Sequence, residues 1–276
     1  MRAILRNTLP LLALLWLAPH LADRSALAPW LLSPAIGLAI YRLTIVMHDC
    51  THSTLFVGRR MNRALGSLLG ACSGIDFVSF SKLHWQHHRS FGALDDPQRF
   101  HYADLKRMSR GEFMWHLFKP LLGLNLRHAF PESVIAPANL ARLARTGELG
   151  VVVCVQALLL ALVTGMGRYP VLALLPALSA LTFGLFFSQL RGIAEHGSTG
   201  STAEAGNVRS HAPNWLDRVV LYDLNFNYHA EHHENPHVPS CHLQAVHDAD
   251  HDGCMPPTSM LGTLRAMYNG MRRSHA

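Results

Sequence analysis

Four apolar runs constrain the fold of this chain more than any other feature. They cover residues 4–22, 26–47, 149–166 and 170–190. A helix needs about 20 apolar residues to cross a bilayer, and each run is close to that length. The first run follows Arg2 and Arg6 and resembles a signal peptide, but the second begins so soon afterwards that a membrane hairpin is favoured. We therefore expect an all-α integral membrane protein with four transmembrane helices, the last kinked at Pro176.

The basic residues predict how such a protein is oriented. With four spans, both termini and the segments 48–148 and 191–276 face the same side of the membrane. All but three of the 24 Lys and Arg residues lie on that side, and the exceptions are Arg24, Arg42 and Arg168. The positive-inside rule makes that side the cytosol. We expect a single domain, 1–276, in which these two segments form a cytosolic helical cap. The basic residues form no aromatic-interleaved patch, so no nucleic-acid partner is expected.

Three clusters of histidines lie in the predicted cap. They are His48 and His52 in HDCTH, His84, His87 and His88 in HWQHH, and His229, His232 and His233 in HAEHH. On a helix, residues three and four apart share a face, so each cluster can direct imidazoles at one point. The eight imidazoles are too many for one tetrahedral ion and suit two ions with open positions. A single histidine of this kind is usually a surface residue, but three spaced clusters predict a metal centre.

The residue types alone do not name the metal, because imidazole binds iron, zinc, copper and nickel. Carboxylates close to the clusters are expected to orient the ring N–H groups and to offset the positive charge of the ions. These are Asp49, Asp95, Asp96, Glu195 and Glu231. Three further histidines lack cluster spacing, and we expect them to be ordinary surface or interfacial residues: His101, His116 and His128.

The three clusters, in this order around apolar runs, resemble the histidine boxes of the membrane fatty acid desaturase and hydroxylase superfamily. The resemblance extends from about Tyr41 to Leu243. It implies two Fe ions held above the membrane helices and the use of dioxygen to remove hydrogens from a carbon chain. The eight box histidines would be ligands, His196 would complete the set, and Asn225, one helical turn before His229, would reach the metal through water. Zinc, which is redox-inert, could not support such an oxidation.

The resemblance also implies an activity and its partners. We expect an oxidoreductase that introduces a double bond into the acyl chain of a lipid or fatty acyl substrate. A hydroxylase of an acyl chain or another small amphiphile is the alternative. The substrate would be an acyl lipid, an acyl thioester or a related amphiphile. No Gly-x-Gly-x-x-Gly motif follows a strand-like run and no haem domain is appended, so electrons would come from a separate donor such as a ferredoxin or a b-type cytochrome.

Two readings from other classes remain open at this point. A membrane metal transporter would place its site near the bilayer midplane, yet no predicted span carries a histidine cluster within its apolar stretch. A membrane zinc hydrolase would be expected to carry His-Glu-x-x-His or a nucleophile elbow, and neither occurs. The metal content of the purified protein would distinguish these readings from the di-iron oxidoreductase.

Overall fold

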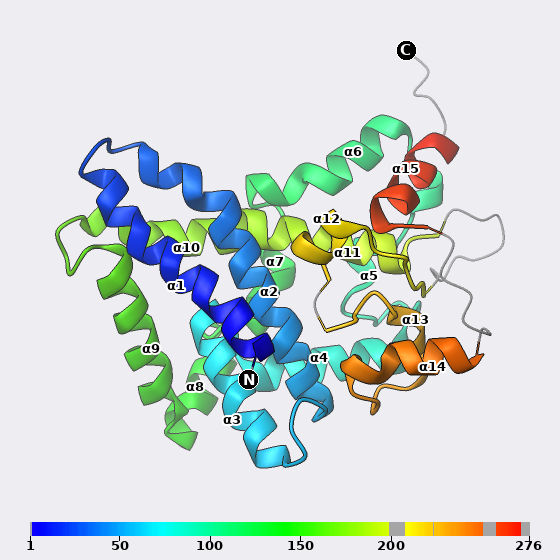
Figure 1. Ribbon diagram of the computed structural model, residues 1–276, viewed down its shortest axis with the longest axis horizontal. Coiled ribbons are helices and arrows are strands. Elements are labelled where there is room, and N and C mark those ends of the chain that lie inside the picture. The colour runs from blue at the N-terminus through cyan, green and yellow to red at the C-terminus, as the bar shows by residue number, and fades with distance from the viewer. Residues whose placement is uncertain (1, 199–207, 223, 251–257, 272–276) are drawn as a thin grey trace. The chain divides into compact units, whose positions relative to one another are not determined.

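The computed structural model describes residues 2–198, 208–222, 224–250 and 258–271 (Figure 1). Within these ranges the chain is helical or irregular and forms no β-strand, only an isolated bridge between Ile75 and Ser133. The all-α prediction is therefore confirmed. The chain divides into two compact units, which are described separately. Unit 1 comprises Met1–Ser81 and Pro120–Phe187, and unit 2 comprises Lys82–Lys119 and Ser188–Ala276.

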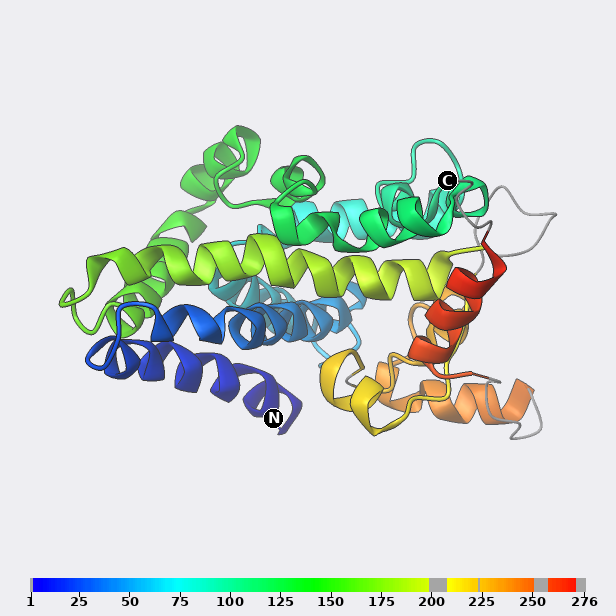
Figure 2. The same ribbon diagram turned by 90° about the horizontal axis from the view of Figure 1, so that it is seen from above.

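An antiparallel hairpin of apolar helices begins unit 1. Helix α1 (Arg2–Ala22) is followed by the 3-10 helix η1 (Ala28–Leu32) and by α2 (Ser33–His52). The two long helices lie side by side in Figures 1 and 2, with Leu11, Leu15 and Leu43 buried. The segments Arg2–Ala22 and Ala28–His52 are each long and apolar enough to cross a membrane. The first predicted span thus matches α1, whereas α2 runs past the predicted end of the second and includes the first histidine cluster.

The last predicted span also extends further than expected. The candidate span Pro170–His196 joins η5 (Pro170–Ala173), α10 (Leu174–Ser179), the π-helix η6 (Ala180–Gly184) and α11 (Leu185–His196). Pro176 lies inside α10, and the irregular backbone follows it at the π-helix. At Gly37 of α2 a Cβ would lie 2.5 Å from the Phe183 Cβ, so glycine there allows α2 to approach this turn closely.

The third predicted span corresponds to α9 (Glu148–Val163), which is bent by 108° relative to the preceding α8 (Pro137–Thr146). Gly147 separates the two helices with φ +75°, a left-handed conformation that glycine adopts without strain. Of the described helices, three are long and apolar enough to cross a membrane, or four if this bent pair forms one span.

The remaining helices of unit 1 are α3 (Arg59–Ser73), the first residues of α4 (Phe77–Ser90), α7 (Leu126–Ala129) and η4 (Phe130–Glu132), with η3 (Lys119–Leu122) at the boundary. Helix α3 is amphipathic and buries Asn62, Gly66 and Leu69 on one face. A Cβ at Gly66 would lie 2.4 Å from the Phe77 ring, so this small residue allows close packing against the start of α4.

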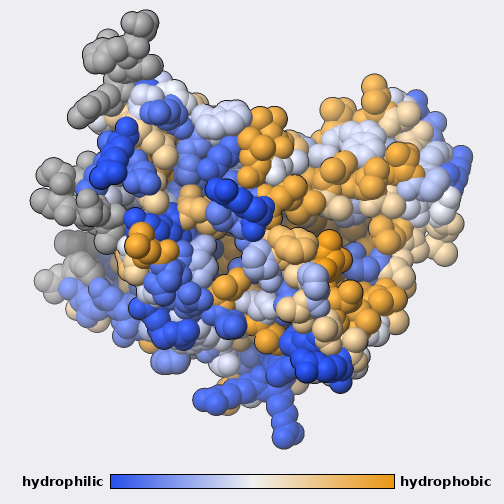
Figure 3. Space-filling model, turned by 180° about the vertical axis from the view of Figure 1, so that it is seen from behind, coloured by the Kyte–Doolittle hydropathy of each residue, from blue (hydrophilic) through white to orange (hydrophobic). Residues whose placement is uncertain are grey.

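The outer surface of the long helices in unit 1 is apolar. Leu9 and Trp16 of α1 are 55% and 54% exposed, and Leu158 of α9 is 71% exposed. Hydrophobic side chains cover much of the surface that the apolar helices present in Figure 3. Large exposed apolar patches of this kind mark contact with a membrane or a partner. Together with the lengths of these helices, the apolar surface supports a membrane protein.

Unit 2 is built from short helices around the end of α11. They are α5 (Arg99–Tyr102), η2 (Leu105–Arg107), α6 (Arg110–Phe118), α12 (Trp215–Val220), α13 (His229–Glu234), η7 (Ser240–His242), α14 (Leu243–Asp250) and α15 (Met260–Gly270). Helices α6 and α12 begin with capping boxes at Ser109 and Asn214. The buried apolar residues include Leu105, Phe113, Ile193 and Phe226.

Candidate metal centre

Unit 2 brings seven predicted ligands into groups that could hold metal ions. His84, His87 and His88 lie on α4, His196 ends α11, and His229, His232 and His233 lie on α13. The first group is His84, His88 and His232, and the second is His87, His196 and His233. A third set, Glu195, His196 and His229, overlaps the second. Within each set, the ligand atoms lie within 4.8 Å of one another. The prediction that each cluster is helical is confirmed.

The helical spacing explains how one cluster contributes to two groups. His84 and His88 are four residues apart, so they lie one above the other and join the same group. His87 is displaced around the helix axis and joins the other group. The cluster on α13 divides in the same manner, with His232 in the first group and His233 in the second. Two neighbouring sites are thus produced by one repeated sequence pattern.

The nitrogen separations in the first group fit a common ion. His88 Nε2 lies 3.0 Å from His84 Nε2 and 3.2 Å from His232 Nε2. Two nitrogens that are each about 2.1 Å from one ion at right angles lie about 3.0 Å apart. Three imidazole nitrogens that converge on each other in this way cannot all be satisfied by hydrogen bonds, because a neutral ring has only one N–H. Binding of a metal ion would resolve this conflict.

The second group and the third set share His196, and together they have a more informative hydrogen-bond pattern. His229 Nε2 lies 3.0 Å from His196 Nε2 and 3.5 Å from a carboxylate oxygen of Glu195. His87 Nδ1 lies 2.9 Å from Asp96 Oδ1, so this nitrogen carries the proton and donates it to the carboxylate. The His87 Nε2 lone pair is then buried, with no hydrogen-bond partner among the described residues. A buried nitrogen of this kind is costly unless an ion binds it.

Asp96 is held in its charged form by its surroundings. Burial alone would raise its pKa, but hydrogen bonds from His87, Tyr102 and the Gln98 amide outweigh burial and hold the pKa of Asp96 below its usual value. The Gln98 N–H donates at 2.8 Å, and the Tyr102 hydroxyl donates to the second carboxylate oxygen. An ionised Asp96 fixes the tautomer of His87 and makes its Nε2 a stronger donor to a metal.

Burial favours the neutral form of His88 and His229. Burial, reinforced by His87, lowers the pKa of His88 to about 3. Burial also lowers the pKa of His229 well below its usual value, with further contributions from His233 and His196. A metal binds the unprotonated imidazole, so these groups need not lose a proton before they bind an ion at neutral pH.

The first cluster belongs to unit 1. His48 and His52 occupy the last turn of α2, where both are buried and their ring centroids lie 4.8 Å apart. Their i,i+4 spacing places them on one helix face, as the sequence predicts. Asp49 lies between them in the sequence and is also buried. That these residues share a centre with the histidines of unit 2 stays a prediction from the sequence.

The predicted carboxylates differ in their contacts. Glu195 accepts a hydrogen bond from Arg191 Nε at 2.6 Å and also approaches His229. Glu231, by contrast, accepts hydrogen bonds from Ser210 and from His247 Nδ1. The two hydrogen bonds of the Glu231 carboxylate therefore join α13 to the segment at Ser210 and to α14 at His247. The Asp95 side chain is exposed, and its backbone carbonyl accepts a hydrogen bond from Gln86.

Asn225 does not lie one helical turn before His229 on a common helix. Helix α13 begins at His229, and Leu224 and Asn225 both have a left-handed backbone, with φ +56° and +62°. Asparagine tolerates this conformation better than most residues. The Asn225 Nδ2 donates to the Cys241 carbonyl at 3.3 Å. The expectation of a helical position was wrong because the chain turns sharply before α13, and a role through water at the metal stays a prediction.

Two histidines predicted to be surface or interfacial residues are buried instead. His101 Nδ1 lies 2.8 Å from Gln189 Oε1, and His116 Nε2 lies 2.9 Å from the His101 carbonyl. Lys119 donates to His116 Nδ1 at 3.1 Å, which leaves the proton of His116 on Nε2. The prediction failed because burial of these residues depends on α11, which lies far away in the sequence. At Gly192 of α11, a Cβ would lie 2.7 Å from the His101 ring.

His211 and His247 are further buried residues outside the predicted ligand set. His247 bonds to Glu231, as described above. His211 is 0% exposed and stacks on Tyr222 with ring centroids 6.1 Å apart. Burial, aided by the charge of Arg209, lowers the pKa of His211 to about 4. Neither residue lies in a cluster with metal-ligand spacing, so no local sequence pattern indicates their burial.

Comparison with known proteins relates the chain to lipid-modifying enzymes. It is 29% identical over 242 residues to sphingolipid delta(4)-desaturase/C4-monooxygenase DES2 of Bos taurus, covering 84% of this chain and 68% of the relative. It is 29% identical over 227 residues to sphingolipid delta(4)-desaturase DES1 of Drosophila melanogaster, covering 79% and 65%. A fatty acid desaturase of Bacillus subtilis (strain 168) is 29% identical over 92 residues, which are 33% of this chain and 26% of the relative. No solved structure matches the chain.

The family comparison covers most of the sequence. The model of the family described as fatty acid desaturase matches residues 25–260. This range contains all three histidine clusters and His196, and therefore every group described above. The chain belongs to the fatty acid desaturase family.

Proposed function

We propose that this oxidoreductase is an oxygen-dependent di-iron enzyme that introduces a double bond into the acyl chain of a lipid or fatty acyl substrate. The observation that carries the proposal is that the histidines of unit 2 form one set of convergent ring nitrogens at His84, His88 and His232, and two overlapping sets that share His196. Two ions bound together with dioxygen would supply the oxidising power that an unactivated carbon chain requires, whereas redox-inert zinc would not.

Each residue of the centre has a separate task in this proposal. His84, His88 and His232 would hold one iron, while His87, His196, His229 and His233 would hold the other. Asp96 keeps the proton of His87 on Nδ1, and Glu195 offsets charge beside His229. His48 and His52 complete the ligand set, a step that rests on the sequence pattern. Electrons come from a separate donor such as a ferredoxin or a b-type cytochrome.

The relatives favour a lipid amphiphile as the substrate. The Bos taurus protein is named both a sphingolipid delta(4)-desaturase and a C4-monooxygenase. We propose that this chain acts on an acyl lipid, an acyl thioester or a related amphiphile with a polar head and a long apolar chain. The double name also keeps hydroxylation as the second candidate, since both reactions begin with removal of a hydrogen from the same chain. Family membership argues against the metal transporter and the zinc hydrolase.

Metal analysis tests the centre, and product analysis tests the reaction. We expect two irons per chain in the purified protein, loss of iron in His87→Ala and His233→Ala, and unchanged iron in His128→Ala, which alters a partly buried histidine outside the ligand sets. Zinc without iron would overturn the proposal. Mass spectrometry of lipids incubated with the enzyme and its reductant should show loss of two hydrogens. Incorporation of a labelled oxygen atom would instead identify a hydroxylase.

A further inference from the structure

Unit 1 contains a cavity that the proposed reaction does not use. Its volume is about 400 Å³, within the usual range for sites that bind small molecules. No histidine and no proposed metal ligand lines it. The lining residues come from α3, the start of α4, α8, α9 and the segments that join them, and four of them are charged: Arg60, Arg63, Asp76 and Glu148.

The cavity follows from the pattern of side-chain sizes along α3. Arg60, Ala64 and Ser67 recur at helical spacing and so line the cavity from one face of the helix. The opposite, buried face carries Asn62 and Gly66. Because Ala64 and Ser67 are small, the space between α3 and α9 is not filled by side chains. The walls that remain are largely apolar.

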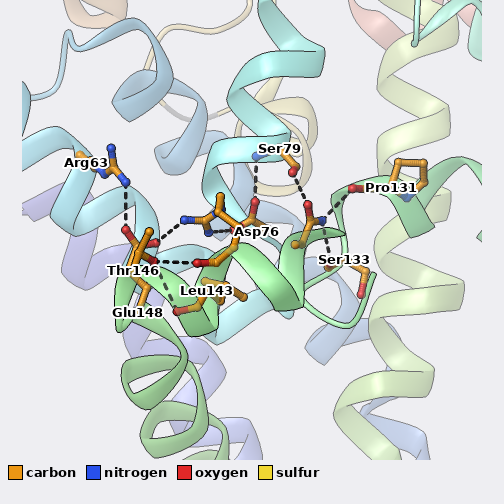
Figure 4. A network of polar contacts seen from close by, with 10 residues as sticks. Arg63, Asp76, Ser79, Pro131, Ser133, Leu143, Thr146 and Glu148 are labelled. Carbon is orange, nitrogen blue, oxygen red and sulfur yellow. Dashed lines mark hydrogen bonds and ion pairs between the residues drawn. The ribbon is translucent and has the colours of Figure 1, made fainter. Parts of the chain in front are cut away.

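An ion-pair network forms one edge of the cavity (Figure 4). Arg63 donates to Glu148 Oε1 at 2.9 Å, and Arg142 donates to the other oxygen of Glu148 at 2.9 Å. Arg142 also bonds to Asp76. Both carboxylates at the cavity are therefore engaged by arginines.

Arg60 gives the cavity an excess of positive charge. It lines the cavity, is exposed, and forms no ion pair within the described part of the chain. Three arginines, Arg60, Arg63 and Arg142, thus lie at or beside an edge that carries two carboxylates. A ligand with one negative charge would balance this edge.

The neighbouring helices indicate where the ligand comes from. Helix α8 is amphipathic and α9 is apolar, and the sharp bend between them lies beside the ion-pair network. An apolar helix that continues from an amphipathic one at a sharp angle is typical of the membrane interface. Val151 lines the cavity and is 51% exposed, so the apolar wall continues to the outer surface of α9.

We infer that this cavity binds an anionic glycerophospholipid of the bilayer, with its phosphate at Arg60 and Arg63 and an acyl chain along Leu68, Val151 and Val152. A phospholipid matches both the charge of the edge and the apolar walls, and the membrane supplies it at high concentration. The site would stabilise the packing of α3 against α9. The lipid site shares no residue with the metal centre, so the lipid-binding experiment and the metal analysis test the two proposals separately.

Native mass spectrometry of the protein in mild detergent tests this site. The probes are phosphatidylglycerol and phosphatidylcholine with identical acyl chains, added in equal amounts. We expect the wild type to retain phosphatidylglycerol preferentially. Arg60→Gln should reduce that retention about fivefold, as expected for loss of one basic residue near an anionic head group. Arg59→Gln is the matched control, because the adjacent Arg59 is exposed and does not line the cavity.

The possible outcomes distinguish a specific lipid site in the cavity from non-specific attraction of anionic lipid to the basic helix α3. Equal retention of the two lipids, or equal losses in Arg59→Gln and Arg60→Gln, would overturn the inference. A second variant, Ser67→Leu, fills the cavity without changing charge. It should lose the bound lipid, and in lipid-free detergent it should unfold at the same temperature as the lipid-free wild type. Lipid binding that persists in a folded Ser67→Leu protein would also overturn it. Glycerol phosphate should not displace the lipid, and displacement would show that a free phosphate is the ligand.

Discussion

At the scale of single residues, the contact between Asp96 and His87 makes the sharpest prediction. Asp96→Asn preserves the shape of the side chain but removes the charge that holds the proton on His87 Nδ1. Loss of such a partner typically lowers metal affinity about 10- to 100-fold. Competition with a chelator of known affinity measures this loss. Asp95→Asn is the control, because the Asp95 side chain is exposed and should leave affinity unchanged. Equal effects of the two variants would contradict the role of Asp96.

The buried imidazoles predict how the stability of the metal-free protein depends on pH. The pKa of His88 falls from 6.5 to about 3 on folding, and the pKa of His229 is also lowered. Between about pH 3 and pH 6.5, the unfolded chain therefore binds more protons at His88 than the folded chain does. Stability should be full above about pH 6.5 and should fall as the pH drops from there towards about 3. Denaturant unfolding of the chelator-treated protein at several pH values measures this dependence.

The variant His88→Gln measures how much His88 contributes to the pH dependence of stability. His88→Gln cannot take up a proton at this position, so its stability should change less steeply with pH than that of the wild type. The comparison is made without metal, so loss of a ligand does not affect it. If the wild type and His88→Gln gave parallel curves, the lowered pKa of His88 would be refuted.

Single residues also show where the sequence was informative. The spacing of His84 and His88 places both on one helix face, as helix geometry predicts. His87 joins a different group, so the expectation that the whole cluster directs its imidazoles at one point was wrong. The burial of His101 could not, because it requires the absence of a Cβ at Gly192, far away in the sequence. Contacts of this kind depend on how distant helices pack, and no local pattern in the chain reveals them.

At the scale of elements, hydrophobic length predicted the long helices but not their ends. Helix α2 continues through His52 and α11 through His196, because a helix leaving the membrane need not stop where its apolar residues stop. The π-helix at Ala180–Gly184 was not predicted either. Pro176 predicted a kink in this span, and the irregular backbone begins four residues later, at the π-helix.

Close packing of α2 against this π-helix predicts the effect of a single methyl group. In Gly37→Ala the new Cβ would lie 2.5 Å from the Phe183 Cβ and 2.7 Å from the Ser179 carbonyl oxygen, so one helix must move. Overpacking of this kind typically costs about 1–3 kcal/mol. Thermal unfolding in detergent should show a lower transition temperature. Gly150→Ala is the control, because its Cβ would meet no atom within 4 Å. A wild-type transition temperature for Gly37→Ala would contradict the close approach.

At the scale of the whole molecule, the composition of unit 2 limits the number of membrane crossings. Its two stretches, 82–119 and 188–276, contribute His87 and His196 to one group of ligand atoms. Both stretches must therefore lie on the same side of the membrane. The chain between them must cross an even number of times, and α9 together with the span Pro170–His196 provides two crossings. We therefore expect α9 to cross the membrane although α8 bends away from it.

A contact within unit 1 supports the same topology. Arg168, which follows α9, pairs with Asp23 at 2.7 Å, and Asp23 lies in the turn between α1 and α2. The two turns must therefore share a side of the membrane. If α1 and α2 each cross the membrane, Asp23 and Arg24 lie opposite the two segments that hold most of the basic residues, and from the positive-inside rule we expect both turns outside the cytosol.

Epitope tags can test this topology directly. One tag is inserted after Ser25, a second after Gly167, and a third is added after Ala276, each in a separate variant. In sealed vesicles with the outer face exposed, antibodies should reach the first two tags without permeabilisation, and the third only after it. Iron content reports whether each tagged protein has folded. If α9 re-entered the membrane instead of crossing it, the tags after Ser25 and Gly167 would lie on opposite sides. The His87 and His196 segments could then not face the same compartment, and the two-group metal centre would fail with the four-span topology.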